Sequence, residues 1–231
     1  MSEIVYEDNH LLVAVKPPNQ LTQGDETGDV ALLDELKDYI KQKYGKPGDV
    51  YLGLVHRLDR PVGGLVAFAR TSKAASRLSD QLRTHAMHRD YLAVVQQGDT
   101  LPDQGTLHDW LQKGGEGVRV VPRGTEGAQE ARLHYRVLAR QGEAALVQVT
   151  LETGRKHQIR VQMSYCGHPI VYDMRYGTGK RGENIALWGA KLTLTHPTLK
   201  TPMTFASLPR GSAFEPYRQT MIQWINQEEN Q

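Results

Sequence analysis

Cysteine is almost absent from this chain of 231 residues, which has only Cys166. A single thiol cannot form an internal disulfide, and it cannot supply a zinc site built from several thiolates. No stretch approaches the ~18 continuous apolar residues of a membrane-spanning helix, and the start, MSEIVYEDNH, lacks the basic end and apolar run of a signal peptide. We therefore expect neither a membrane anchor nor a disulfide framework. A reducing cytoplasm fits this composition, although a chain without disulfides could also be exported.

Net charge is also small, because 28 basic residues face 26 acidic ones and give a formal charge of +2. The basic residues are nevertheless concentrated in two segments, which are Arg57, Arg60, Arg70, Lys73, Arg77, Arg83 and Arg89, and then Arg155, Lys156, Arg160, Arg175, Lys180 and Arg181. If both segments share a face, that face could follow a phosphate backbone. The alternative is two solvated surfaces without a partner.

Secondary-structure patterns indicate one large domain with hydrophobic and charged contents, 39% and 23%, typical of a globular protein. Runs of apolar residues predict strands near 4–6, 11–15, 65–69, 91–95, 131–138, 144–151, 187–195 and 203–206, with a further apolar run at 52–56. Helical spacing predicts helices at about 29–44, 72–86, 156–165 and 215–227. Several links look like hairpins and βαβ alternation is missing, so we expect an α+β fold with a mixed, largely antiparallel central β-sheet and flanking helices. The glycine-rich segment 98–128 is expected to form a hairpin-like insertion or flap.

One carboxylate stands out at Asp59, in the segment VHRLDRPVGGLVAFA at 55–69. Pro61 biases the preceding residue away from helix, which places Asp59 in a loop. Gly63 and Gly64 then let backbone pass close to a neighbouring group. The carboxylate could form a structural Asx-turn or belong to a site.

Two further side chains are ambiguous when taken alone. Tyr91 begins an apolar run, so its ring could fill the core or stack on a base. Arg160 lies on a predicted helix, where an isolated arginine normally lies on the surface with its stem along the core. The helix start behind Gly154 could present free N–H groups to a phosphate.

Together the three segments resemble the RluA-type pseudouridine synthases, whose motifs are H-R-L-D, K/R-x-Y-x-A and T-G-R-x-H-Q-I/L-R. The matching blocks here are HRLD at 56–59, RDYLA at 89–93 and TGRKHQIR at 153–160, with Lys16-Pro17 and LTLTHP at 192–197. The order agrees along residues 4 to 225. Departures are Asn19, which replaces a glycine that follows K-P-x and tolerates a left-handed backbone, Gly63 in place of serine, and Trp188 in place of a frequent histidine.

The resemblance implies an enzyme that isomerises uridine in ribosomal or transfer RNA to pseudouridine. Asp59 would be the catalytic carboxylate, acting as nucleophile or as base at C2′, with Arg160 paired to it and Tyr91 stacked on the uracil. RNA contacts are expected from Arg57, Arg60, Arg89, Arg155, Lys156 and His157. The reaction needs neither a metal nor a nucleotide cofactor, and we expect a monomer that acts on structured RNA without a preceding S4 domain.

Two other functions are considered, a non-catalytic RNA-binding module and a hydrolase. A non-catalytic RNA-binding or chaperone module could use the same basic face. Hydrolase classes lack support, since G-x-S-x-G and H-E-x-x-H are both missing and RYGTGKRG at 175–182 does not fit Walker A.

Overall fold

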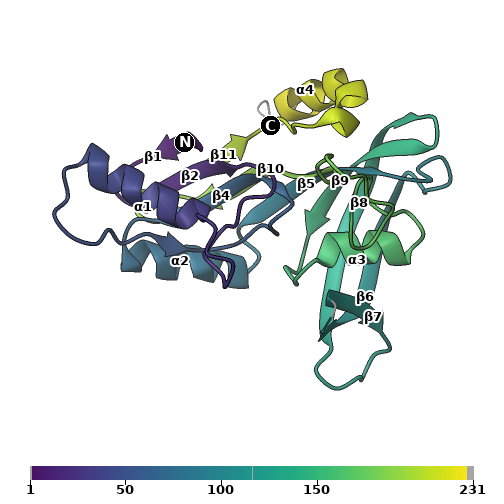
Figure 1. The fold of residues 1–231 in the computed structure, drawn as a ribbon, viewed down its shortest axis with the longest axis horizontal. Coiled ribbons are helices and arrows are strands. Elements are labelled where there is room, and N and C mark those ends of the chain that lie inside the picture. Colours follow the sequence, from purple (N-terminus) through teal and green to yellow (C-terminus); the bar gives the residue numbers. More distant parts are fainter. Residues whose placement is uncertain (1, 116, 228–231) are drawn as a thin grey trace. The chain divides into compact units, whose positions relative to one another are not determined.

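The computed structural model describes residues 2–115 and 117–227, and the chain divides into two compact units. Unit 1 comprises Met1–His88 and Gly189–Ser207, and unit 2 comprises Arg89–Trp188 and Leu208–Gln231. Figure 1 shows the helices and strands of both units. Within the described ranges, no helix combines the length and the apolar character needed to cross a membrane.

Unit 1 is a sheet with two helices. Its elements are β1 (Glu3–Glu7), β2 (Leu11–Lys16), α1 (Leu32–Lys43), β3 (Gly53–Leu54), β4 (Gly63–Ala69), α2 (Ser72–Arg83), most of β10 (Leu187–Thr195) and β11 (Pro202–Ala206). The strands follow the order β1-β2-β4-β10, with β11 on β10 and β3 on β4. β2 and β4 are core strands, since all of their residues are buried, and β2 pairs antiparallel with β1 and β4.

Local sequence explains both helices of unit 1. The buried residues of α1 are Leu32, Leu36 and Ile40, which recur at the spacing of one helical face. α2 begins at Ser72 because the Thr71 side chain accepts a hydrogen bond of 3.1 Å from the N–H of Ala74.

Glycine is required where β4 meets β10. Gly64 has a φ of +127°, and a Cβ built on it would lie 2.4 Å from the backbone nitrogen of Gly189. No larger residue fits without moving one strand, so this pair fixes the approach of β10 to the beginning of β4.

Unit 2 is built on a second run of antiparallel strands. Its elements are β5 (His88–Val95), β6 (Gln104–Gly114), β7 (Gly117–Val121), β8 (Gln129–Gln141), β9 (Ala144–Leu151), α3 (Gln158–Tyr165), a 3₁₀ turn η1 (Ser212–Tyr217) and α4 (Arg218–Gln227). The strand order is β5-β9-β8-β6-β7, with each described pairing antiparallel. α3 packs on β6 and β7, and a small apolar cluster joins them through Leu111, Val118, Ala131 and Val161.

The expected fold class is confirmed, as a mixed, largely antiparallel sheet with flanking helices. Several boundaries differ from the sequence expectation, including the start of α1 at Leu32 rather than 29 and the end of α2 at Arg83 rather than 86. α3 begins at Gln158 rather than 156, because His157 adopts a left-handed φ of 54°. The last helix begins at Arg218, after a 3₁₀ turn that contains Pro216. The apolar run 52–56 contributes only the strand Gly53–Leu54.

Candidate active site

Asp59 lies in the loop between β3 and β4 of unit 1, as the proline and glycine pattern predicts. Its side chain is half-buried, Arg57 and Arg60 beside it are exposed, and Leu58 is buried. The N–H of Val62 donates to the carbonyl of Asp59 over 3.0 Å, which closes a tight turn directly after the carboxylate. The local chain therefore buries one neighbour and leaves both arginines accessible.

Two buried side chains hold this loop, one from the end of β2 and one from the segment after it. The Thr22 hydroxyl donates to the carbonyl of Leu58 over 2.9 Å and accepts from the N–H of Leu58 over 3.3 Å. Lys16 Nζ, on a residue that is 0% exposed, donates to the carbonyls of Arg60, Pro17 and Gln20 at 3.0, 3.0 and 2.7 Å. Burial lowers the pKa of Lys16 to about 7, although the negative charge of Asp59 has the opposite effect and raises this pKa. Three carbonyl acceptors occupy all three ammonium protons, which favours the charged form.

Arg60, an expected RNA contact, has partners of its own in unit 1. Its Nη2 lies 2.5 Å from Asp29 Oδ2, and its Nε donates to the carbonyl of Asn19 over 3.3 Å. Asn19 has the left-handed backbone anticipated from its sequence position, with a φ of 67°. Both charged side chains are 44% and 53% exposed, so this ion pair is weak and open to competition by another anion.

Arg160 lies in α3 of unit 2 and is buried, with 5% exposure. Its Nε and Nη2 donate to Asp173 Oδ2 and Oδ1, each over 2.8 Å. The same carboxylate, which is 0% exposed, also accepts from the N–H groups of Arg175 and Tyr176 at 2.9 and 3.1 Å. The isolated reading of Arg160 as a surface side chain is wrong, because a partner 13 residues away balances its charge inside the fold.

Asp173 is held ionised by this arrangement. Burial acts to raise the pKa of its carboxyl, but the Arg160 guanidinium and the N–H groups of Arg175 and Tyr176 outweigh burial, and the pKa lies below its ordinary value. The resulting ion pair fixes the plane of the guanidinium through two parallel hydrogen bonds.

Tyr176 links Arg160 to two other parts of unit 2. The Arg160 guanidinium lies 5.2 Å from the centre of the tyrosine ring. The hydroxyl accepts from the N–H of Val118 in β7 over 2.9 Å, and it lies 2.8 Å from Nδ1 of His157. The hydroxyl therefore ties β7 to the residue that directly precedes α3.

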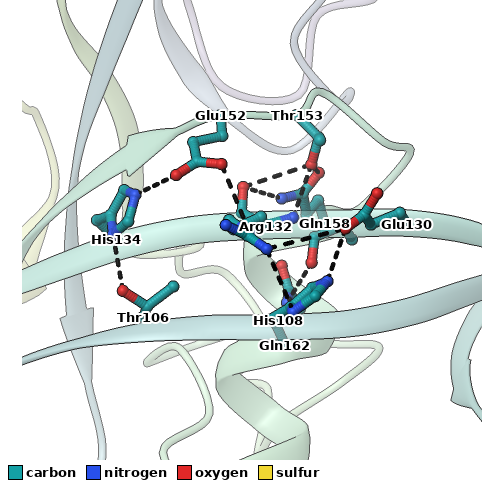
Figure 2. Close-up of polar contacts among 10 residues, drawn as sticks. Thr106, His108, Glu130, Arg132, His134, Glu152, Thr153, Gln158 and Gln162 are labelled. Atoms are coloured by element: carbon teal, nitrogen blue, oxygen red, sulfur yellow. Dashed lines mark hydrogen bonds and ion pairs between the residues drawn. The ribbon is translucent and has the colours of Figure 1, made fainter.

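The segment TGRKHQ at 153–158 is fastened to β8 by side chains of its own motif (Figure 2). Thr153 Oγ1 accepts from the N–H of Arg132 over 2.9 Å and donates to Gln158 Oε1 over 2.8 Å. Gln158 Nε2 donates to the carbonyl of Arg132 over 3.1 Å, and Oε1 accepts from the N–H of Arg155 over 2.9 Å. The N–H of Arg155 is therefore bonded within the loop. A phosphate contact at the helix start behind it stays a prediction.

Arg89 and Tyr91 stand on β5, also in unit 2. A Cβ added to Gly154 would lie 3.1 Å from Arg89 Nη2, so the guanidinium lies against the glycine of the TGR segment. Tyr91 is 6% exposed and lies opposite Val149 of β9. The structure thus brings Arg89 next to the loop that carries Arg155 and Lys156, both of which are exposed.

An exposed polar network that the sequence patterns did not reveal covers β6, β8 and the end of β9 (Figure 2). His108 Nε2 lies 2.7 Å from Glu130 Oε1, and Arg132 Nε lies 3.6 Å from Glu152 Oε2. His134 contacts Glu152 through Nε2. These side chains are between 40% and 48% exposed, which is typical of a solvated strand face.

The sequence analysis did not identify three residues that hold the candidate site residues in place. They are Thr22, which bonds the residue before Asp59, and Asp173 and Tyr176, which contact Arg160. Asp173 had one signal, as the only acid between Arg155 and Arg181. Asp59 belongs to unit 1 whereas Tyr91 and Arg160 belong to unit 2, and the pairing of Asp59 with Arg160 stays a prediction. In the described residues no group of three or more His, Cys, Asp or Glu side chains could hold a metal ion.

Comparison with known families gives this arrangement a context. A family model described as RNA pseudouridylate synthase matches residues 10–165. The chain belongs to the RNA pseudouridylate synthase family. The family expected from the motifs is thereby confirmed, and the stretch that matches includes positions 59, 91 and 160.

Curated members of the family are similar over most of this chain. The ribosomal large subunit pseudouridine synthase C of Escherichia coli is 34% identical over 207 residues, which are 84% of this chain and 62% of that protein. The enzyme of the same name from Vibrio vulnificus is 32% identical over 94% of this chain and 69% of its own length. The uncharacterized RNA pseudouridine synthase YhcT of Bacillus subtilis is 34% identical over 84% of this chain and 64% of its own. This chain thus spans less than two thirds of the length of the first curated relatives that it matches, such as that of Salmonella typhi at 62%.

Solved structures agree on the fold. Human RNA Pseudouridylate Synthase Domain Containing 4 superposes with a TM-score of 0.75 at 23% identity, covering 96% of this chain and 92% of that one. Human RNA Pseudouridylate Synthase Domain Containing 1 gives a TM-score of 0.71 at 20% identity, covering 96% and 87%.

Proposed function

We propose that this protein is an RNA pseudouridine synthase that converts uridine in ribosomal or transfer RNA to pseudouridine. The observation that carries the proposal is the family match over residues 10–165, a stretch that includes Asp59, Tyr91 and Arg160. The relatives named as ribosomal large subunit synthases favour ribosomal RNA as the first substrate to test.

The reaction breaks the bond between N1 of uracil and C1′ of ribose, turns the base, and joins C5 to C1′. Asp59 either attacks the nucleotide covalently or removes the C2′ proton to give a glycal. Arg160, held in orientation by Asp173, would pair with the Asp59 carboxylate and keep it ionised. Tyr91 would stack on the uracil and accept the C5 proton in the last step. An isomerisation of this kind consumes no oxidant and transfers no external group, so the proposal includes neither a metal nor a nucleotide cofactor.

A stacked uridine cannot reach these groups, so the enzyme would flip it out at a cost of about a few kcal/mol. Phosphate contacts from the exposed Arg57, Arg60, Arg155 and Lys156, and from the partly buried Arg89 and His157, would offset that cost. The same proposal describes a cytoplasmic monomer in which both units form one catalytic domain. In it, the β6–β7 hairpin within segment 98–128 serves as a flap over the RNA.

Chemical labelling of pseudouridine in RNA incubated with the purified protein tests the proposal. We expect new labelled positions with the wild-type chain and none with Asp59→Asn, which should still bind RNA. Equal labelling by both proteins would remove Asp59 from the mechanism. RNA binding without labelling by either protein would favour the non-catalytic RNA-binding or chaperone module. Mapping in total RNA from a deletion strain would then identify the RNA and the uridine.

A further inference from the structure

We propose that Thr22 is a positioning residue for Asp59, acting through the backbone of Leu58. The proposal rests on the proposed function, because it concerns how the carboxylate of that reaction is held. Thr22 lies 36 residues before Leu58 and outside the three motif blocks.

Thr22 uses both hydrogen-bonding capacities of its hydroxyl on a single residue. Its side chain is buried, with 4% exposure for the residue, and it donates to the Leu58 carbonyl over 2.9 Å. The Leu58 N–H donates back to the same oxygen over 3.3 Å. The hydroxyl therefore replaces the two backbone bonds that a neighbouring strand would supply, at the residue directly before Asp59.

Thr22 is itself anchored by a helix. The N-cap residue of α1, Ala31, has no side chain that can cap the helix. The N–H groups of Leu32 and Leu33 instead donate to the carbonyls of Leu21 and Thr22, over 2.8 and 3.1 Å. These contacts satisfy two N–H groups of the first helical turn and fix the backbone that carries the Thr22 hydroxyl.

The carboxylate thus stands in a loop in which three consecutive carbonyls are bonded. The carbonyl of Leu58 accepts from Thr22, that of Asp59 from Val62, and that of Arg60 from Lys16. A loop without regular secondary structure would otherwise leave these groups to water or unpaired. Because rates fall steeply when a reacting group shifts by about 1 Å, the hydroxyl should act on the chemical step more than on RNA binding.

Two substitutions isolate the hydroxyl. Thr22→Val keeps the branched shape and removes the oxygen, whereas Thr22→Ser keeps the oxygen and removes a methyl group. Thr27→Val is the matched control, because Thr27 lies in the same connection but its hydroxyl is exposed and bonded to Asp25. The readouts are the single-turnover rate at saturating RNA, the Kd for RNA and the melting temperature of each variant.

We expect Thr22→Val to lower the single-turnover rate by about 10- to 100-fold with a Kd within about twofold of wild type. Thr22→Ser should recover most of the rate, and Thr27→Val should match wild type. A wild-type rate in Thr22→Val, or equal losses in Thr22→Val and Thr22→Ser, would overturn the proposal. If Thr22→Val does not fold, Thr22→Ala is compared with Thr22→Ser below their melting temperatures, and equal rates overturn it in the same way. Asp59→Asn separates the two levels, because activity in that variant contradicts the proposed function whatever Thr22 does.

Discussion

Arg160 and Asp173 form a two-pronged ion pair inside unit 2, with both hydrogen bonds at 2.8 Å and both side chains almost fully buried. Neither charge is solvated by water in this position, so each depends on the other. The pair explains how an arginine of α3 can be buried in unit 2 while its guanidinium keeps a fixed orientation.

Replacing Asp173 by asparagine should therefore expose the cost of an unbalanced buried charge. We expect Asp173→Asn to lower the free energy of unfolding by about 3 kcal/mol, the usual cost of breaking a buried pair. Urea unfolding measures this directly. Asp103→Asn is the control, because Asp103 pairs with Arg140 at the surface and is 90% exposed. Its loss should cost less than about 1 kcal/mol, and equal losses in both variants would contradict the buried pair.

The lowered pKa of Asp173 predicts how the stability of the protein changes in acid. Its folded pKa lies below the ordinary value of 3.8, so its contribution is fully present above 3.8 and is lost as the pH falls through the lower folded pKa. Asp173→Asn cannot titrate at this position. The variant should lose less stability than wild type between pH 4 and its acid midpoint, as followed by circular dichroism at about constant ionic strength. Parallel acid curves for the two proteins would show that the pair does not persist in solution.

Tyr176 connects the β6–β7 hairpin to the start of α3, and this connection can be tested by substitution. Tyr176→Phe keeps the ring beside Arg160 but removes the oxygen that meets Val118 N–H and His157 Nδ1. We expect a loss of about 1–2 kcal/mol in stability, with faster hydrogen exchange at Val118. Tyr165→Phe is a matched control at the exposed end of α3, where the side chain is 68% exposed. Unchanged exchange at Val118 in Tyr176→Phe would mean that the hydroxyl does not hold β7.

The sequence predicts those features that depend on near neighbours. β9 begins and ends where its apolar run does, at Ala144–Leu151, and Thr71 caps α2 as its position suggests. Asn19 adopts the left-handed backbone expected at its position. Each of these features is decided within a few residues, by side-chain alternation, capping or local backbone preference.

Features that depend on distant partners could not be predicted. From the sequence alone, Arg160 is expected at the surface, because its partner Asp173 cannot be identified. Thr22 likewise resembles any loop residue, because its hydrogen bond to Leu58 is seen only in the structure. α3 starts later than expected because His157 adopts a left-handed backbone, which is unfavourable for most residues other than glycine. In this conformation His157 contacts the hydroxyl of Tyr176, a residue 19 positions away. The role of Asp59 was inferred from family motifs alone, and its meeting with Arg160 stays a prediction.

Arg60 gives the sharpest test of RNA binding, because it already has an anion beside it. Asp29 lies 2.5 Å from its guanidinium, in an exposed pair that a phosphate could displace. Asp29→Asn should therefore strengthen RNA binding by about two- to fivefold at low salt, since a competing charge is removed. Arg60→Ala should weaken binding and reduce the slope of log K against log salt by about 0.7–0.9, the value for one lost phosphate contact.

Arg83→Ala is the control for this pair, because Arg83 also pairs with an exposed aspartate, Asp80, and, although it lies in the first basic segment, it is not among the six residues expected to contact RNA. Its affinity should match wild type, as should that of Asp80→Asn. If Asp29→Asn and Asp80→Asn strengthened binding equally, the gain would come from net charge over the whole surface. A gain confined to Asp29→Asn, absent when Arg60 is also replaced by alanine, would mean that the released guanidinium itself meets the RNA.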